Sequence, residues 1–302
     1  MKKYLLLYLI FLLTIWGEGI EAKTRGLSSL RIGVGGRAVG MGEAFSAVSD
    51  GAISTYWNPA GLVETDGYEL VTAHNKWLFD VSSEFISFAS NRGDYVLGLS
   101  FYYTDMGKIE ARTFRNEKDP IGFFSANDIS LGISFAKKIK KEFDIGITLK
   151  YLYEKIYIEK SSGYAFDIGV RYHLFKDVLS TGIVIKNLGT MTKMRDKKIS
   201  LPTTYRAGIM FNLSEIFNKK DFLFISSDYE ISPDYNNHLM FGLEARVSEV
   251  FAIRCGYQNG YRERNFCGGI GISLNFIRVD YGFTPFSSDL GNTHRFSLKF
   301  NW

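Results

Sequence analysis

Histidines and cysteines offer the most versatile side-chain chemistry in this chain, and both are few. The four histidines are His74, His173, His238 and His294. They do not have the short spacing with which side chains share a metal ion, and no Gly-x-Ser-x-Gly, P-loop or His-Glu-x-x-His motif occurs. No serine stands out as the partner of a histidine in a lipase-like pair. The sequence therefore predicts no catalytic residue, no metal site and no cofactor.

The two cysteines and one glycine-rich segment suggest more specific hypotheses. Cys255 and Cys267 fall on neighbouring predicted strands, but the alternation of residue types places their side chains on opposite faces. A disulfide cannot reach across a sheet, so two free thiols are expected. Residues 33–38 read Gly-Val-Gly-Gly-Arg-Ala. They lack the preceding strand and the βαβ unit that a dinucleotide fingerprint requires, which argues against nucleotide binding.

The composition narrows the class of protein. Of the 302 residues, 46% are hydrophobic and 16% are aromatic, which excludes a disordered chain because such chains are poor in both. The 25 Phe, 18 Tyr and 30 Gly against only 5 Pro favour a β-rich fold. The net charge of +4 is small and evenly spread, so nucleic acid is not an expected partner.

The amino terminus predicts export. Lys2 and Lys3 precede an apolar run of about 13 residues that ends at Trp16, and small residues follow up to Ala22. A basic start, a short apolar core and a small-residue cleavage site are typical of a secretory signal peptide, so residues 1–22 are expected to be removed. The run is shorter than the ~20 residues of a membrane-spanning helix, which argues against the alternative of an uncleaved anchor. No cysteine follows the run, so lipoprotein processing is excluded.

From Tyr68 onward, apolar and polar residues alternate. In the last segment, Phe296, Leu298, Phe300 and Trp302 alternate with polar residues. A period of two predicts half-buried strands. We predict about fourteen strands of about ten residues each. They are centred near residues 71, 86, 99, 132, 148, 168, 183, 208, 225, 243, 255, 270, 280 and 298.

The connections between these strands alternate in length. Short turns are predicted near 91–93, 138–141, 175–177, 214–220, 247–249 and 275–276, and longer polar loops near 107–124, 156–162, 188–202, 230–237, 258–264 and 284–293. This pattern, with an even strand number and an apolar outer face, predicts an all-β fold, a transmembrane antiparallel β-barrel of the bacterial outer membrane. A secreted β-sandwich is the competing fold. Aromatic residues near the ends of most strands, and the terminal Trp302, favour the barrel because its interfacial girdles are aromatic.

Glycines recur on the polar face of successive strands. They are Gly98, Gly132, Gly146, Gly169, Gly182, Gly208, Gly242, Gly256, Gly269 and Gly282, and we call them the glycine belt. A glycine inside a strand often marks the close approach of another backbone, and fourteen strands enclose more space than wall side chains fill. The glycine belt therefore predicts room for a plug in the lumen. Relief of crowding in a tight barrel is the alternative.

The predicted plug, or hatch, is residues 23–66, which lack strand alternation. Gly36 to Phe45 reads Gly-Arg-Ala-Val-Gly-Met-Gly-Glu-Ala-Phe, and Trp57 to Leu62 reads Trp-Asn-Pro-Ala-Gly-Leu. These stretches closely resemble the amino-terminal hatch of FadL-like outer-membrane proteins, particularly the PorV/PorQ branch. The resemblance implies a fourteen-stranded outer-membrane barrel, residues 67–302, with the amino-terminal segment folded into its lumen.

The resemblance implies two possible functions. FadL-type members pass long-chain fatty acids or other hydrophobic small molecules, whereas PorV-type members serve type IX secretion and shuttle secreted proteins to surface attachment machinery. The outer loops here are short and charged, notably 107–124 and 188–202, which favours the PorV/PorQ branch. We therefore expect a docking or shuttle role in protein export, with a hydrophobic channel as the alternative. The expected partners are outer-membrane lipid and, for the two roles respectively, exported proteins with secretion-machine components or a hydrophobic small molecule.

The expected functional residues belong to the hatch. They are Gly36, Arg37, Gly40, Gly42, Asp50, Trp57, Asn58, Pro59 and Ala60. Arg37, Asp50 and Asn58 are expected to pin the hatch to the wall, Pro59 fixes a turn before the first strand, and Asn58 to Ala60 is interpreted as a structural gate motif. Lumen charges of mixed sign are expected to hold the hatch and keep the interior wet, with a polar permeation path as the alternative. They include Asp144, Asp167, Arg171, Arg206, Asp228, Glu244, Arg254 and Asp280.

Overall fold

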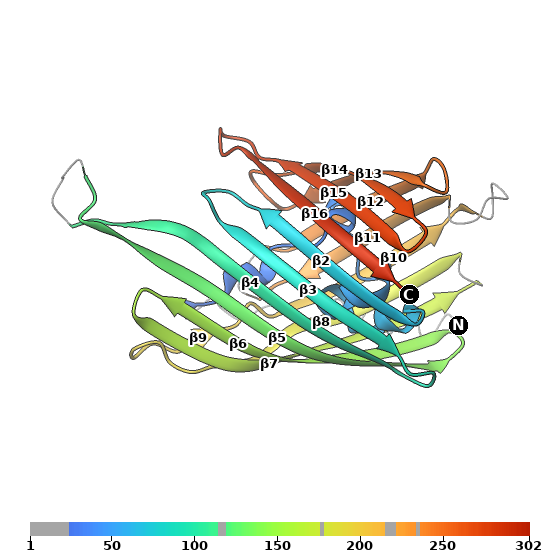
Figure 1. Cartoon of the computed structure of the whole chain (residues 1–302), viewed down its shortest axis with the longest axis horizontal. Helices are drawn as coiled ribbons and strands as arrows, with labels where there is room; N and C mark the ends of the chain where they lie inside the picture. The colour runs from blue at the N-terminus through green and yellow to red at the C-terminus, as the bar shows by residue number, and fades with distance from the viewer. Residues whose placement is uncertain (1–23, 114–118, 176–177, 215–221, 234–235) are drawn as a thin grey trace.

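Fourteen antiparallel strands form a closed barrel, which confirms the predicted strand number (Figure 1). The computed structural model describes residues 24–113, 119–175, 178–214, 222–233 and 236–302, so the predicted signal peptide (1–22) lies outside the described residues. The wall strands are β2 (Tyr68–Lys76), β3 (Ser82–Asn91), β4 (Val96–Ala111), β5 (Gly122–Lys140), β6 (Phe143–Ile156), β7 (Glu159–Leu174), β8 (Leu179–Met191), β10 (Thr204–Asn212), β11 (Leu223–Ile231), β12 (His238–Arg246), β13 (Phe251–Asn259), β14 (Phe266–Leu274), β15 (Ile277–Pro285) and β16 (Asn292–Asn301). Each predicted strand centre falls inside one of them.

The alternation of residue types along each strand explains the two faces of the wall. On β5, the side chains of Leu131 and Ile133 are 47% and 62% exposed and point outward. Between and beside them, Gly132 and Ser134 are buried and face the lumen. An apolar outer face is stable only against lipid, because water would not solvate so continuous an apolar band.

The wall is taller on one side than on the other. Strands β4 to β8 have 13 to 19 residues, whereas the remaining wall strands have nine or ten. The added residues lie at the end opposite the carboxyl terminus, where β4 and β5 reach furthest to the left in Figure 1. The barrel therefore carries a one-sided extension at its outer mouth.

Three predicted loops are wrong because strands continue into them. In the predicted loop 188–202, β8 runs to Met191 and β9 (Ile199–Ser200) follows. In the predicted loop 107–124, β4 runs to Ala111 and β5 begins at Gly122, with residues 114–118 outside the described part. The predicted loop 156–162 is a tight turn at Tyr157 and Ile158 between β6 and β7. The polar residues that suggested loops lie in the one-sided extension, where the apolar and polar faces of the strands no longer alternate. Most of the predicted turn at 214–220 falls outside the described residues.

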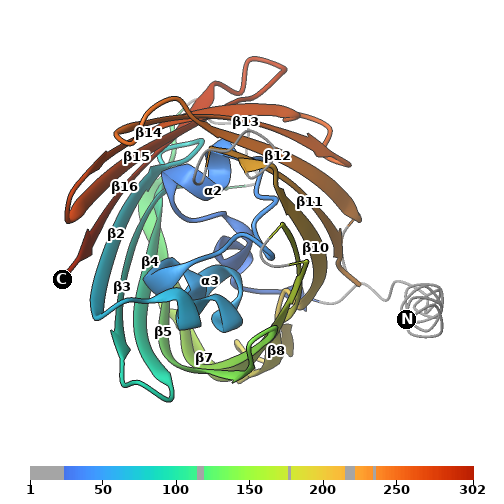
Figure 2. The same ribbon diagram turned by 90° about the vertical axis from the view of Figure 1, so that its right-hand side faces the viewer.

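Residues 24–66 lie inside the barrel, and we keep the name hatch for them (Figure 2). The hatch contains β1 (Thr24–Arg25), η1 (Ser28–Arg31), α2 (Gly36–Gly40), η2 (Gly51–Ile53), α3 (Ser54–Trp57) and η3 (Pro59–Glu64). The two residues of β1 pair in parallel with β9 (Ile199–Ser200) and are the exception to the expected lack of strand structure. No helix in the described ranges is both long and apolar enough to cross a bilayer.

The hydrophobic core sits in the lumen and is built largely by the hatch. Phe45 and Trp57 are 1% exposed, and the Trp57 ring packs against Phe45 at 5.8 Å and against Tyr56 at 5.1 Å between ring centroids. Tyr56 in turn contacts Phe85 and Tyr102 of the wall. The arrangement differs from that of a soluble domain, in which strands turn their apolar face to the core. Here the apolar hatch side chains pack against one another, and the wall contributes mostly small and polar residues to the lumen.

The last strand closes the barrel on the first. β16 pairs antiparallel with β2, and the backbone of Trp302 exchanges two hydrogen bonds with that of Tyr68, at 2.9 and 3.1 Å. The Trp302 ring stacks on Tyr68 with 6.1 Å between centroids. Trp302 thus completes the pairing of β16 with β2 at the end of the barrel that carries the short turns.

Candidate functional site

The interface between the hatch and the wall is the candidate functional site, and the glycine belt forms much of it. An added Cβ on nine of the ten belt glycines would meet atoms of the hatch. The contacts are Gly98 with Thr55, Gly146 with Pro59, Gly169 with Asn58, Gly182 and Gly208 with Ser46, Gly242 with Met41, Gly256 with Gly42, Gly269 with Gly40 and Gly282 with Gly36. Gly132 is the exception, since it faces Ser100 and Thr148. The hatch backbone therefore lies directly on the wall.

The glycines of the hatch make the same close contact from the other side. A Cβ on Gly36 would lie 2.6 Å from the carbonyl oxygen of Asp280, and one on Gly40 would lie 3.0 Å from the Cα of Gly269. Gly42 has a φ of +66°, which L side chains rarely adopt. Backbone rests on backbone here because neither side carries a side chain.

Arg37 links the hatch to β12 through buried charge. Its side chain is 6% exposed and donates two hydrogen bonds to Glu244, at 2.7 and 3.0 Å, and one to Asp50 at 2.6 Å. Glu244 also accepts from Arg254 at 2.5 Å, and Arg254 reaches Asp280 at 2.9 Å. A buried arginine is stable only when its charge is paired and its donors are used, and both conditions are met.

Asp50 extends this network to the last strand. Lys299 of β16 lies 3.5 Å from Asp50 and 2.7 Å from Glu69. Burial would raise the pKa of Asp50, but the charges of Arg37 and Lys299 outweigh burial and hold this pKa well below its usual range. The carboxylate therefore adds stability above the ordinary carboxyl pKa of about 4, and this contribution is lost as the pH falls toward the lowered value.

Another part of the interface is formed by Trp57, Asn58, Pro59 and Ala60. The Trp57 indole donates to the carbonyl of Val34 at 3.0 Å, within the hatch. The Asn58 amide donates to Ser46 within the hatch at 2.8 Å and to Val170 of the wall at 3.3 Å, and its oxygen accepts from Ala60 at 3.1 Å. Asn58 thereby caps η3, and Pro59 occupies its first position, where a missing N–H costs nothing.

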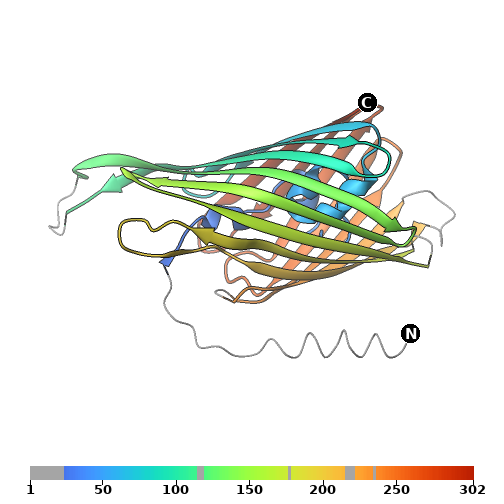
Figure 3. The same ribbon diagram turned by 90° about the horizontal axis from the view of Figure 1, so that it is seen from below.

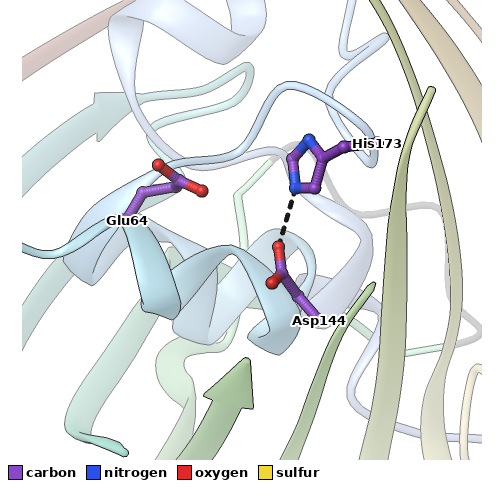
Figure 4. Close-up of side chains that lie close together, drawn as sticks. All are labelled: Glu64, Asp144 and His173. Atoms are coloured by element: carbon purple, nitrogen blue, oxygen red, sulfur yellow. Dashed lines mark hydrogen bonds and ion pairs between the residues drawn. The ribbon is translucent and has the colours of Figure 1, made fainter. Parts of the chain in front are cut away.

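A second fastening lies at the carboxyl end of the hatch, where the sequence predicted Asp144 and Arg171 among the lumen charges that hold the hatch but missed Glu64. Arg171 of β7 donates to Glu64 of the hatch at 2.7 Å, to Asp144 of β6 at 3.1 Å and to the carbonyl of Ser49 at 2.8 Å. His173 contacts the same Asp144 oxygen at 2.8 Å (Figure 4). Same-face spacing of Arg171 and His173 is visible in the sequence, but the neighbouring Asp144 and Glu64 come from other elements.

This cluster also sets the limits of its chemistry. Glu64, Asp144 and His173 offer ligand atoms within 4.8 Å of one another, which is the geometry of a possible metal site. The Arg171 guanidinium already neutralises both carboxylates, so a cation would have to displace it. His173 also contacts Ser180 at 3.0 Å, a Ser–His–Asp line that the sequence did not suggest, but Ser180 is only 2% exposed. The arrangement fits a fastening better than a nucleophile.

The two cysteines lie as predicted. Cys255 is exposed on the outer face, Cys267 is buried on the lumen side, and both are free. In the register of β13 and β14, Cys255 pairs with Gly268 and Cys267 with Gly256. The one-residue offset puts the two sulfurs on opposite faces, which is the geometry the alternation predicted.

A closed fourteen-stranded barrel around an amino-terminal hatch defines the class of FadL-like outer-membrane barrels. The CymD monoaromatic hydrocarbon channel is 14% identical over 90% of this chain and 98% of its own, with a TM-score of 0.67. The toluene transporter TodX of P. putida is 11% identical over 89% and 99%, with a TM-score of 0.66. A FadL homologue of Pseudomonas aeruginosa is 11% identical over 89% of this chain and 99% of its own, with a TM-score of 0.59. At these identities the likeness shows a shared fold.

The family follows from the sequence. The family model described as type IX secretion system protein PorV matches residues 19–231, and the chain belongs to the PorV family. A comparison with curated proteins gives no match. The protein is therefore an outer-membrane β-barrel of a Gram-negative bacterium, as expected, and its apolar outer face contacts membrane lipid.

Proposed function

We propose that this protein is a docking component for exported proteins in a type IX secretion pathway, and that its own barrel does not conduct them. In this proposal residues 1–22 direct export, residues 23–66 act as the hatch and residues 67–302 form the membrane barrel. The hatch residues from Gly36 to Ala60 serve as structural fasteners. The family supports a role in type IX secretion. The fastened hatch supports the proposal that the barrel itself does not conduct the exported proteins.

The observation that carries the proposal is that the hatch is fastened along its length. Glycine contacts run from Gly36 to Pro59, and ion pairs hold Arg37 in the first half of the hatch and Glu64 near its carboxyl end. Buried ion pairs are costly to break, because each leaves an uncompensated charge. A hatch fixed in this way closes the lumen, so that a folded exported protein is held at the outer mouth.

The tall side of the wall offers a surface for such a protein. A tilted strand needs about 9–11 residues to cross the membrane, so the added residues of β4 to β8 stand above it (Figure 3). Ile121, Phe123 and Ile158 there are 62–65% exposed. A groove beside them is lined by Phe124, Tyr157, Met194 and Ile199, among others. Apolar side chains exposed to water in this number mark an interaction surface.

The test is co-purification of the tagged full chain from native outer membranes, with mass spectrometry of bound proteins and lipids. We expect exported proteins that share a carboxyl-terminal domain, or components of the secretion machine, to be enriched over an untagged control. Retention of a fatty acid or another apolar molecule alone would contradict docking. That result would support the second candidate, a FadL-type channel.

The channel has one specific observation in its favour, a cavity of about 550 Å³ at the outer mouth beside the hatch. To separate the roles, cysteines introduced at Ser29 of the hatch and Asp128 of β5 would lock the hatch, since these two side chains already hydrogen-bond to each other at 2.5 Å. A channel would lose uptake when the lock is oxidised and regain it on reduction. Docking would be unaffected by either treatment.

We also infer that the protein is not an enzyme. The PorV family and the barrel fold support this, and the Ser180–His173–Asp144 line is occupied by its contacts to the hatch fastening. Purified protein should therefore give no hydrolysis of short-chain nitrophenyl esters beyond that of a Ser180→Ala variant.

A further inference from the structure

The cavity at the outer mouth has a composition that the hatch fastening does not explain. Its volume is about 550 Å³, within the range of sites for small ligands. It lies between the first turn of the hatch and the loops that follow β2, β11, β13 and β15. Its principal side chains are Arg31, Trp77, His238, Tyr261, Arg264 and Phe286. We call it the mouth cavity.

Aromatic rings surround one guanidinium in this cavity. Trp77 and Phe286 meet edge to face at 5.5 Å, and His238 stacks on Tyr261 at 3.7 Å with an angle of 3° between the rings. The Arg264 guanidinium lies 4.0 Å from the Tyr261 ring centre, 5.4 Å from that of Trp77 and 6.0 Å from that of Phe286. Its position is therefore fixed by three rings at once.

Arg264 is anchored from below. Its side chain is 7% exposed, and Glu43 of the hatch lies 3.6 Å away. That distance is long for an ion pair with direct hydrogen bonds. The carboxylate therefore balances the charge of the guanidinium without accepting a hydrogen bond from it. Such a buried cation is poorly matched to a pure hydrocarbon ligand, which would strip its solvation and return no hydrogen bond.

His238 adds a directed hydrogen-bond donor. The residue is 4% exposed, and its Nε2 lies 3.5 Å from Nη2 of Arg31. A guanidinium only donates, so Nε2 accepts and the proton of the neutral ring is on Nδ1. Nδ1 is buried without a hydrogen-bond partner among the described residues, and it faces Gly260, which also lines the cavity. Gly260 covers this N–H, so a ligand oxygen reaches it when the loop at Gly260 shifts.

Guanidinium groups make up most of the charged lining of the cavity. Arg31, Arg262 and Arg264 line it, against the single carboxylate of Glu263. Glu263 is turned to the neighbouring loop, where Ser287 and Ser288 donate to it at 2.7 and 2.8 Å. Glu230 pairs with Arg31 at 3.4 Å and Glu43 with Arg264 at 3.6 Å from outside the lining. The lining thus combines guanidinium donors, an N–H without a partner and flat apolar walls.

We propose that the mouth cavity binds an organic carboxylate whose body is aromatic or short and apolar. The carboxylate meets Arg264 and Nδ1 of His238, and its apolar body packs between Trp77 and Phe286. The carboxylate belongs either to a free small molecule or to the end of a peptide chain. This inference goes beyond the proposed docking role and does not depend on it.

The test is calorimetric titration of the purified full chain with 3-phenylpropionate and with its uncharged analogue 3-phenylpropanol. A hydrogen-bonded charge is worth about 1.5–3 kcal/mol, so the acid should bind at least about 10-fold more tightly than the alcohol. Arg264→Gln should remove most of this preference. Arg195→Gln, which changes an arginine 71% exposed in another loop, is the matched control and should leave it intact.

A second variant guards against misfolding, since Arg264→Gln leaves Glu43 buried. Phe286→Ala should weaken both ligands several-fold while keeping the preference for the acid, because it removes a wall and not the charge. Equal binding of acid and alcohol, absence of binding, or a preference unchanged in folded Arg264→Gln would overturn the proposal.

A peptide arm identifies the source of the carboxylate. A pentapeptide ending in phenylalanine is compared with the same peptide carrying a terminal amide. Tight binding of the free acid peptide would assign the cavity to chain ends, and binding of phenylpropionate with rejection of both peptides would assign it to small molecules. Failure of all ligands would leave the recovery of exported proteins by co-purification unaffected, so the two proposals fail separately.

Discussion

At the scale of single residues, Arg37 shows how the hatch combines burial with charge. It is the residue of the hatch that binds two carboxylates at once, Glu244 in the wall and Asp50 in the hatch. Removing one partner of a buried ion pair destabilises a protein more than replacing both partners with apolar residues, because the remaining charge stays buried without a counter-ion.

Arg37→Gln is therefore expected to lower the free energy of unfolding by about 3–5 kcal/mol, since Glu244 loses one of its three arginine partners and two hydrogen bonds. Urea unfolding in detergent micelles measures this. Arg195→Gln breaks an ion pair with Glu159 that is open to water and should give no measurable change. Equal effects of the two substitutions would mean that Arg37 does not pin the hatch.

The cysteines give a second prediction at this scale. Cys255 and Cys267 lie on opposite faces, so the mass of the protein should be the same before and after reduction. In unfolded protein both thiols should react with a maleimide. In folded protein Cys267, which is 7% exposed, should be protected. A loss of two hydrogens in the unreduced protein would show a disulfide and contradict the register of β13 and β14.

At the scale of elements, the glycine belt lets the hatch backbone pack directly against the wall. Two glycines next to each other on β14 separate this role from the general effect of glycine in a strand. Gly269 lies against Gly40 of α2, whereas a Cβ on Gly268 would meet only a carbonyl oxygen at 3.7 Å. The two positions differ in face and share the same strand.

Gly269→Val should destabilise the folded protein by about 1–3 kcal/mol, because it overpacks the contact with α2. It should also speed tryptic cleavage at Arg31 and Arg37, as the hatch is displaced. Gly268→Val points away from the hatch and should change stability by less than about 0.5 kcal/mol. Identical protease patterns for the two variants would argue that the belt only relieves crowding in the wall.

Strands were easier to predict than their ends. Alternation located all fourteen, because lipid on one side and a wet or packed lumen on the other impose a period of two. It failed in 107–124 and 156–162, where β4 to β7 leave the membrane and that contrast disappears. There, pairing between neighbours such as Lys108 with Ser125 decides that strand continues, and pairing is not visible in one segment alone.

At the scale of the whole molecule, the one-sided extension is separable from the barrel. Residues from Lys108 to Ala111 pair with Gly122 to Ser125 of the same hairpin. Replacing Lys108–Ser125 by an Asn-Gly turn should leave the rest of the wall paired, because Asn-Gly fits a two-residue hairpin. We expect unchanged heat-modifiability on gels and at least about a 10-fold loss of co-purified exported proteins, as removing a central contact patch costs more than 1.4 kcal/mol.

Replacing Lys141 and Glu142, the turn at the opposite end of β5, by Asn-Gly is the matched control. It alters a hairpin of the same strand but leaves the extension whole, so recovery of exported proteins should not change. If shortening the outer hairpin leaves recovery intact, the docking surface lies elsewhere on the outer mouth.

The sequence alone determined the barrel, its strand number, the faces of the strands and the family, because each leaves a local signal in residue type or spacing. It also predicted that Arg37, Asp50 and Asn58 pin the hatch to the wall, and this role stays a prediction. Only the tertiary structure decided their partners, the fastening of Glu64 by Arg171, the mouth cavity and the height of the wall. Those features join side chains from strands far apart in the chain, and closure of the barrel, which no single segment encodes, brings them together.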